Sequence, residues 1–171
     1  KRVTLLFNIS DLWPRSAEEL GIIKNRLLLS ISTSLEEYIY DQSDLITGQT
    51  MGIVSDVFRR KKQKRIHWYP NSFDFSTIPK NGKDISYLRQ KMGYRKEDFL
   101  IIYAGILGHA QDIETCLEAA SLIKDQKVKF LFFGTGPEEK KLLSMSIKLD
   151  LNNVKFYGHK RKSDILNILP I

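Results

Sequence analysis

The sequence predicts an α/β protein built on parallel sheets with helices on both faces. Three observations support this fold class. In the second half of the chain, apolar strand patterns alternate with helical patterns, which is typical of a parallel sheet. The strand patterns are continuous apolar runs such as "VKFLFF", as in strands that are buried on both faces. Glycine turns follow these runs where each strand passes into a helix.

The first part of the chain predicts three strands and two helices. A buried strand over 2–9 is followed by the loop "DLWPRSAEELG", in which Ser16 and Glu19 have the spacing of a helix-capping pair. The long apolar segment 25–42 predicts a helix. Next we expect a strand over 43–48, a helix over 50–64 and a strand over 65–71.

Residues 72–84 carry Pro, Gly, Ser and Asn without a usable periodicity, and we interpret them as a linker. Beyond this linker the pattern becomes regular. We expect helices over 84–93, 111–124, 136–150 and 163–169, and strands over 98–105, 128–134 and 153–158.

The composition is that of an ordinary globular protein, with 42% hydrophobic and 27% charged residues. The apolar runs are far too short for a membrane span of about 20 residues. A single cysteine, Cys116, excludes a disulfide framework and indicates a reducing compartment, which favours a cytoplasmic location. We expect Cys116 to belong to the core.

The positive charge is local, because the run "RRKKQKR" at 59–65 supplies six of the seven net positive charges. Such a run is most often a solvated helix end, and otherwise docks on the phosphates of nucleic acid or on anionic lipid. No aromatic residues are interleaved with it, so a nucleic-acid binder is disfavoured. The candidate membrane- or acceptor-side residues are Arg59, Arg60, Lys61, Lys62, Lys64 and Arg65.

Glycine turns at three strand ends indicate a ligand site. Because parallel strands present their carboxyl ends at one edge, these turns are expected to line a single site, and phosphate is the first ligand to consider. A packing role for the glycines is an equally open alternative. The candidate residues are Gly105, Gly108, His109, Gln111, Gly134, Gly136, Gly158, His159 and Lys160, with Arg161 and Lys162 as further neighbours.

The sequence lacks the motifs of dinucleotide binding, phosphate loops, metal sites and nucleophilic catalysis. Neither glycine turn has the G-x-G-x-x-G pattern of dinucleotide sites, and there is no P-loop, so NAD is a weak hypothesis. The three histidines are far apart and no set has metal-ligand spacing, so we predict no metal and no cofactor. No nucleophile elbow or catalytic triad is visible, and the catalytic residues stay unassigned.

The segments "DLWPRSAEELG", "YPNSFD", "YAGILGHAQDIETCLEAA", "FFGTGPEEKKL" and "NVKFYG", in this order, resemble the family 4 retaining glycosyltransferases. Their architecture is the double Rossmann-like GT-B fold. The likeness is greatest to the O-antigen and capsule branch, which moves N-acetylated amino sugars in surface polysaccharide and lipopolysaccharide synthesis. It covers nearly the whole chain, and the order and spacing of the segments carry it rather than any single one.

The resemblance implies that residues 1–75 are the second half of the acceptor-side domain, and residues 76–171 the first half of the nucleotide-sugar domain. It places the reaction between these domains. The diphosphate of the donor would lie against the turn from Gly105 to Gln111, and backbone groups after Gly158 would meet the base. The acceptor would be lipid-linked or a saccharide, and the protein would bind the inner face of the membrane peripherally.

Departures from the family pattern narrow this prediction. Many members have arginine directly after the first glycine and lysine at the helix start, where this chain has Ile106 and Gln111. Where the family customarily has glycine after that lysine, this chain has Asp112. The family's "PNG" segment is replaced by Pro70-Asn71-Ser72. The amino-sugar branch also tends to lack the two cations.

Other family elements would lie outside the sequence. The E-x7-E glutamate pair would follow Ile171, and the glycine-rich donor loop and acceptor histidine would precede Lys1. We therefore expect a central fragment that does not turn over alone and whose unpaired sheet edges favour self-association. A non-catalytic Rossmann-like binding module or subunit is the alternative.

Overall fold

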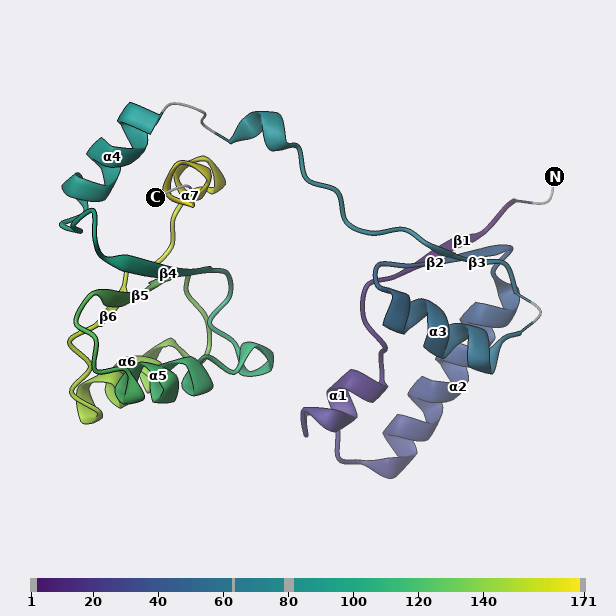
Figure 1. Ribbon diagram of the computed structural model, residues 1–171. Helices are drawn as coiled ribbons and strands as arrows, with labels where there is room; N and C mark the ends of the chain where they lie inside the picture. Colours follow the sequence, from purple (N-terminus) through teal and green to yellow (C-terminus); the bar gives the residue numbers. More distant parts are fainter. Residues whose placement is uncertain (1–2, 63, 79–81, 170–171) are drawn as a thin grey trace. The chain divides into compact units, whose positions relative to one another are not determined.

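The structure is a computed structural model that describes residues 3–62, 64–78 and 82–169 (Figure 1). The chain divides into two compact units, Lys1–Phe73 and Asp74–Ile171. Each unit contains a three-stranded parallel sheet, so the predicted α/β class with parallel strands is confirmed. The sequence placed the division at 75/76, and the acceptor-side and nucleotide-sugar roles of the two parts stay predictions.

The first unit has the strand order β1-β2-β3, with helices connecting the strands. Its elements are β1 (Leu6–Ile9), α1 (Arg15–Glu19), α2 (Arg26–Gln42), β2 (Leu45–Gly48), α3 (Met51–Arg60) and β3 (Ile66–Trp68). β2 is central, and the register aligns Ile9 with Gly48 and Gly48 with Trp68. The carboxyl ends of the three strands therefore lie side by side.

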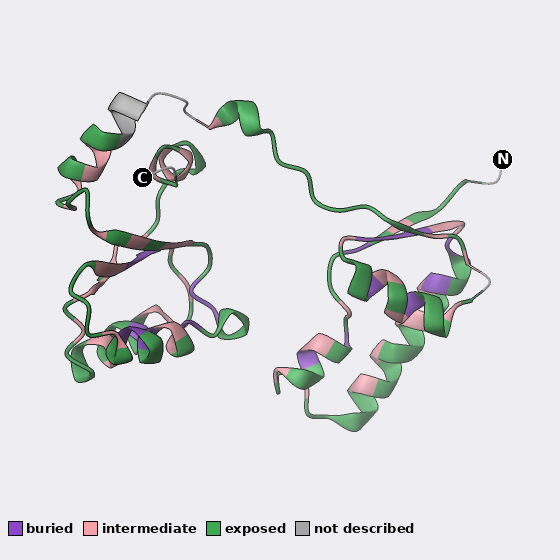
Figure 2. Cartoon of the chain, in the orientation of Figure 1, coloured by how far each residue is buried: buried purple, intermediate pink, exposed green. Residues whose placement is uncertain are grey.

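One face of this sheet forms the core of the first unit. Ile9 and Ile46 pack against Tyr40 of α2 and against Ile53 and Val57 of α3. Side chains alternate between the two faces of a strand, and Ile9 is aligned with Gly48, two residues after Ile46. Ile9 and Ile46 therefore lie on the same face of the sheet, the face that the helices cover. In β1 only Ile9 is buried and its neighbour Asn8 is exposed, whereas the central strand β2 has three consecutive buried residues, Ile46, Thr47 and Gly48 (Figure 2).

The predicted capping pair of Ser16 and Glu19 is wrong. Helix α1 begins at Arg15 with Pro14 as its N-cap, so Ser16 lies inside the helix and caps nothing. Glu19 instead accepts a hydrogen bond of 2.8 Å from Arg15 Nε, one helical turn earlier. The side chain that caps the long helix α2 is Asn25, whose Oδ1 accepts from the amides of Leu27 and Leu28.

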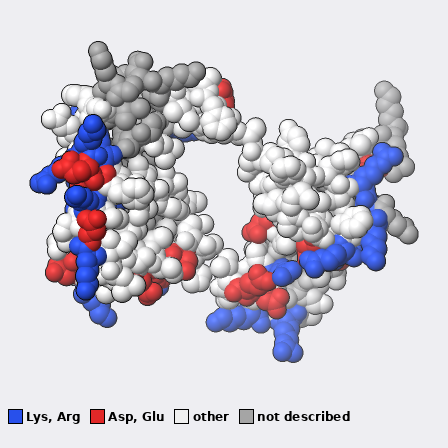
Figure 3. Space-filling model, in the orientation of Figure 1, with Lys and Arg blue, Asp and Glu red and all other residues white. Residues whose placement is uncertain are grey.

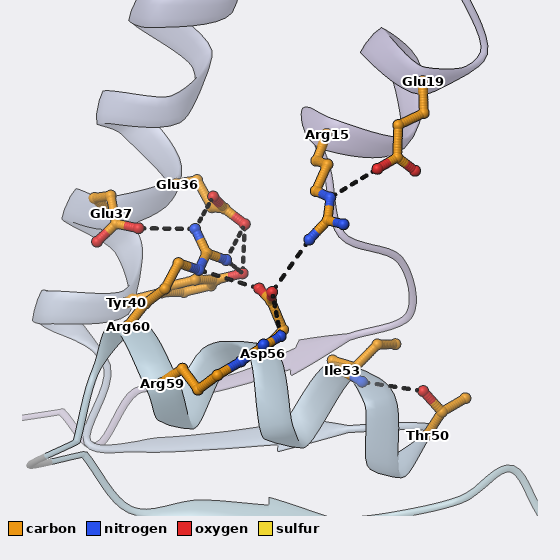
Figure 4. Close-up of polar contacts among 10 residues, drawn as sticks. All are labelled: Arg15, Glu19, Glu36, Glu37, Tyr40, Thr50, Ile53, Asp56, Arg59 and Arg60. Carbon is orange, nitrogen blue, oxygen red and sulfur yellow. Dashed lines mark hydrogen bonds and ion pairs between the residues drawn. The ribbon is translucent and has the colours of Figure 1, made fainter.

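The guanidinium of Arg60 joins α3 to α2, as Figure 4 shows. Its Nη1 lies 2.7 Å from Glu36 Oε2 and 2.8 Å from Glu37 Oε1, and its Nε lies 3.1 Å from Asp56 Oδ2. The hydrogen bond to Glu36 raises the pKa of Arg60 further above its usual value. Burial and a hydrogen bond of 2.6 Å to Glu36 likewise raise the pKa of Tyr40. We name Arg60 with these four partners the Arg60 cluster.

The second unit has the order β4-β5-β6, with β5 in the centre. Its elements are η1 (Phe75–Thr77), α4 (Gly82–Lys91), β4 (Phe99–Ala104), η2 (His109–Gln111), α5 (Ile113–Leu122), β5 (Val128–Phe133), α6 (Glu139–Lys148), β6 (Val154–Phe156) and α7 (Lys162–Ile168). Figure 1 shows α5 and α6 on one face of the sheet and α4 and α7 on the other. The linker predicted over 72–84 contains a 3-10 turn and the start of α4, and its residues 79–81 lie outside the described part of the chain.

The core of the second unit is centred on β5. Phe130 and Phe132 pack with Leu117 of α5 and Leu142 of α6, and Cys116 is half-buried against the same cluster. On the opposite face, Phe133 stacks on Tyr157 with ring centroids 4.6 Å apart. No helix in the described residues is both long and apolar enough to cross a membrane.

Replacing Arg60 with methionine is expected to lower the free energy of unfolding by about 2 kcal/mol, because Glu36 and Asp56 lose a partner in a partly desolvated place. The side chains of these acids are only 11% and 13% exposed. The matched control is Arg59→Met, since Arg59 is 74% exposed and its contact with Asp56 is 3.3 Å long. That change should cost less than about 0.5 kcal/mol. Urea unfolding measures both, and equal losses would contradict a special role for the Arg60 cluster.

Candidate functional site

The carboxyl ends of β4, β5 and β6 border an open groove of about 430 Å³. We name it the carboxyl-edge groove. Four residues expected at a ligand site from the sequence lie together in it: Gly105, Gly134, His159 and Lys160. The complete lining is Ala104, Gly105, Ile106, Phe133, Gly134, Thr135, His159, Lys160, Lys162 and Ile165.

The two glycine turns of this edge lie directly against each other. A Cβ atom on Gly134 would be 1.8 Å from the carbonyl oxygen of Gly105, and one on Gly136 would be 2.3 Å from that of Leu107. The amide of Leu107 donates to Thr135 O at 3.1 Å, and its carbonyl accepts from the amide of Glu138 at 3.0 Å. Packing therefore explains why Gly134 and Gly136 must be glycines, while a ligand role for them stays a prediction.

Gly158 extends the same contact to the third strand. Its carbonyl accepts a hydrogen bond of 2.8 Å from the amide of Gly134, and its φ of +67° is one that glycine adopts without strain. Apart from its two chain neighbours, no atom of the described residues would lie within 4 Å of a Cβ placed on it. The three strand ends are thus joined by backbone contacts, which fixes the floor of the groove.

Gly108, His109 and Gln111, also predicted to bind the donor, do not line the groove. His109 and Gln111 are exposed on η2, just beyond the first turn. Gly108 is buried, and a Cβ there would be 2.6 Å from Gln111 Oε1. Gln111 therefore lies over Gly108 at the outer side of the turn, and the donor contacts assigned to these three residues stay predictions.

Helix α5 begins two residues later than the sequence predicted, because Asp112 takes a left-handed conformation with φ of +45°. Its carboxylate accepts a hydrogen bond of 2.7 Å from the hydroxyl of Thr115. This is the position at which the resembling family customarily has glycine, and the left-handed backbone explains that preference.

The groove offers hydrogen-bond donors and positive charge. Ile106 and Thr135 line it, and their amides have no hydrogen-bond acceptor among the described residues. Within the described part of the chain, the lining includes Lys160 and Lys162 and no carboxylate, while nearby Arg161 is paired with Asp164 at 3.1 Å. Such an arrangement favours an anion. Sequence reasoning missed Thr135, although its place between the two glycines of "FGTGP" could have indicated it.

A larger groove of about 650 Å³ lies at the other edge of the sheet, between the turn after α4 and the amino ends of β5 and β6. Its lining mixes Arg95, Lys127, Lys129 and Lys155 with the carboxylates of Glu97 and Asp98. Ligands of open parallel sheets bind at the carboxyl ends of the strands, so we assign the candidate site to the smaller groove.

Half of the basic run is used to hold the first unit together. Lys61 lies 2.6 Å from Asp41 Oδ1, and Lys64 donates to the carbonyl of Ser43 at 3.0 Å; Arg60 is occupied as described above. Helix α3 ends at Arg60, so most of the run follows the helix instead of continuing it to 64 as predicted. Figure 3 shows a band of Lys and Arg side chains on this unit. The members exposed to solvent are Arg59, Arg60, Lys62 and Arg65, and the Arg60 guanidinium is nevertheless held by its ion pairs.

Within residues 3–62, 64–78 and 82–169, no three His, Cys, Asp or Glu side chains lie close enough together to hold a metal ion. That the protein works without metal or cofactor stays a prediction.

Comparisons with known proteins agree on one family. The family model described as Glycosyl transferases group 1 matches residues 84–171, just over half of the chain. WcaI of Escherichia coli (strain K12), whose name describes a colanic acid biosynthesis glycosyl transferase, is 28% identical over 74 residues, which is 43% of this chain and 18% of WcaI. EpsD of Bacillus subtilis (strain 168), named as a glycosyltransferase, is 32% identical over 74 residues, 42% of this chain and 19% of EpsD.

Solved structures show the same fold over nearly the whole chain. HepE of Anabaena, in complex with UDP-glucose, matches with a TM-score of 0.74 and 19% identity, over 97% of this chain and 44% of HepE. WaaG, a glycosyltransferase involved in lipopolysaccharide biosynthesis, matches with a TM-score of 0.72 and 17% identity, over 96% of this chain and 47% of WaaG. The fold is thus that of GT-B glycosyltransferases, and the chain spans less than half the length of these proteins.

The contact between the glycine turns predicts a large difference between two alanine substitutions. Gly134→Ala should lower the free energy of unfolding by more than about 3 kcal/mol, because its φ of +142° is strained for alanine and the methyl group would overlap a carbonyl. Gly158→Ala should cost only about 1 to 2 kcal/mol, since it has the left-handed strain with open space around it. Urea unfolding of both variants measures this, and similar losses would show that the turns do not pack as described.

Proposed function

The chain belongs to the group 1 glycosyl transferases, and we propose that it forms the central part of a retaining enzyme of this family. The enzyme moves a sugar from a nucleotide-diphosphate donor to a lipid-linked or saccharide acceptor, and the second unit holds the donor. The observation that carries this proposal is the carboxyl-edge groove, with two lysines and two amides that have no acceptor among the described residues.

The diphosphate of the donor would lie in this groove. The amides of Ile106 and Thr135 would donate to phosphate oxygens, and Lys160 and Lys162 would balance their charge. Residues after Gly158, starting with His159, would meet the nucleotide base. The complexes of HepE with UDP and with UDP-glucose support a UDP-sugar as the donor.

Such a groove would promote transfer by stabilising the leaving diphosphate. As the bond between sugar and diphosphate breaks, negative charge grows on the leaving phosphate oxygen. Donors already fixed by the backbone stabilise that charge without having to rearrange. Holding donor and acceptor together contributes through positioning.

An N-acetylated amino sugar is the sugar we propose for transfer into surface polysaccharide or lipopolysaccharide. Ile106 and Gln111 stand where many members of the resembling family have arginine and lysine, which the amino-sugar branch tends to lack. The names of WcaI and WaaG, which refer to colanic acid and lipopolysaccharide, support the surface-polysaccharide setting.

Peripheral contact with the inner face of the membrane completes the proposal. Arg60, Lys61 and Lys64 are held by short intramolecular contacts, whereas Arg59 is 74% exposed and has only a 3.3 Å contact with Asp56. Arg59, Lys62 and Arg65 would therefore supply the attraction to anionic lipid. This surface would bring the first unit to a lipid-linked acceptor at the cytoplasmic face of the membrane.

UDP, and not NAD, is expected to perturb the NMR signals of Gly105, Gly108 and His109. The double variant Lys160→Ala/Lys162→Ala should bind UDP about tenfold more weakly, because two charges close to the phosphates are removed. The matched control is Lys129→Ala/Lys155→Ala, which removes two lysines from the groove at the other edge of the same sheet and should leave the affinity unchanged. If the control variant lost affinity and the first did not, the donor site would be at the wrong edge.

Binding to anionic liposomes at low salt tests the membrane proposal. Arg59→Gln/Lys62→Gln should bind about thirtyfold more weakly, since each basic residue near such a surface contributes about 1 kcal/mol. Lys140→Gln/Lys148→Gln, two basic positions on α6 of the second unit, serves as the control of equal charge. Equal losses in the two variants would mean that only net charge matters and that the first unit has no specific membrane surface.

A further inference from the structure

The carboxyl edge of the first sheet carries a hydrogen-bonded network centred on Gln49. Its Nε2 donates to Ser10 Oγ at 2.8 Å, and its Oε1 accepts from Asn71 Nδ2 at 3.1 Å. Its backbone carbonyl accepts from the indole Nε1 of Trp68 at 3.3 Å, and its amide donates to the carbonyl of Ile9 at 3.2 Å. Gln49 thus connects the ends of all three strands, and each of its four polar groups has a partner.

Trp68 is unusual in being exposed and fixed at the same time. The indole is 56% exposed and ends the strand β3 at this edge. Its Nε1–H is bonded to Gln49, so the edge of the ring is anchored while part of its surface remains open to solvent. Trp68 is not among the core residues of this sheet.

We propose that this edge binds a hexopyranose unit of the saccharide acceptor, with Trp68 as a stacking platform; the proposal rests on the glycosyl transfer put forward above. The C–H groups on one face of a pyranose are attracted by the negative face of an aromatic ring. The hydroxyl groups around its rim require hydrogen-bond partners. Ser10 can still donate its hydroxyl hydrogen, and Asn71 has its amide oxygen.

Gln49 is a positioning residue in this proposal. It touches no ligand, but it fixes the rotamers of Ser10 and Asn71 and the tilt of the Trp68 ring. Its own position follows from the core, because Gly48 before it packs against Ile53. The platform is therefore preorganised by the sheet, which lowers the ordering cost of binding. Its location agrees with the rule that ligands of parallel sheets bind at the carboxyl ends of the strands.

Fluorotryptophan labelling provides the test, because the chain has two tryptophans, Trp13 and Trp68, and hence two fluorine NMR signals. Phe substitutions at each position assign them. Methyl glucopyranoside and methyl N-acetylglucosaminide are titrated to about 100 mM, since one stacking contact with few hydrogen bonds supports only millimolar affinity. We expect a saturable shift of the Trp68 signal with at least one of the two glycosides. Absence of a saturable shift with both would overturn the proposal.

Variants separate the ring from its support. Trp68→Ala should weaken the binding of the responding glycoside about tenfold, whereas Trp68→Phe should restore most of it because a ring is kept. Phe58→Ala removes an aromatic side chain of similar exposure, 53%, from α3 and should change nothing. Gln49→Ala should weaken binding because Ser10 and Asn71 lose the side chain that holds them. It should leave both fluorine signals sharp, since alanine keeps the backbone carbonyl that accepts from Trp68. Broadening at Trp13 and Trp68 together, or equal losses for Trp68→Ala and Phe58→Ala, would contradict the proposal.

The two proposals fail in different ways. UDP binds the second unit in the proposed function, so a UDP titration without shifts at Gly105 would refute the donor site and leave the Trp68 result standing. A UDP response without any saccharide response at Trp68 would refute only this inference.

Discussion

The turn after β4 passes so close to the turn after β5 that neither Gly134 nor Gly136 has room for a side chain. Most features of the candidate donor site depend on this backbone contact. It fixes the positions of Gly105 and Leu107 against Phe133 and Thr135, and it leaves the amide of Ile106 without an acceptor among the described residues. Because the turns are joined by hydrogen bonds and by the buried side chain of Leu107, an anion would meet donors that are already in place.

The two units use positive charge in opposite ways. In the first unit, Arg60 and Lys61 are tied to acids of α2, and these pairs hold two helices together over the sheet. In the second unit, Lys160 and Lys162 border a groove whose described lining contains no carboxylate, although the charge of Lys160 reaches nearby Asp164. Neither lysine has an ion pair within 4 Å in the described part of the chain. This contrast directs the donor hypothesis to the second unit rather than to the basic run.

Much of the fold could be predicted because the strand and helix periods are clear and the order of elements is regular. The edge at which Gly105, Gly134 and His159 meet also followed from the sequence, since parallel strands end at one side. The role of Arg60 could not be predicted, because its partners Glu36 and Glu37 lie more than 20 residues away on another helix.

Local signals misled in two places for physical reasons. Ser16 and Glu19 have capping spacing, but Arg15 competes for Glu19 and the helix begins before Ser16. The start of α5 depends on the left-handed backbone of Asp112. Non-glycine residues seldom adopt this conformation, so the sequence alone does not predict it. Thr135 escaped the sequence reasoning because the feature that makes it a candidate is a backbone amide, which no residue type reveals.

Amide hydrogen exchange with and without UDP tests the central claim most directly, because it reports the backbone groups themselves. The account predicts protection of the segments 104–108, 134–136 and 158–162, which contain the turns of the carboxyl-edge groove. Protection at 93–98 and 126–129 instead, or no protection anywhere in the second unit, would contradict it.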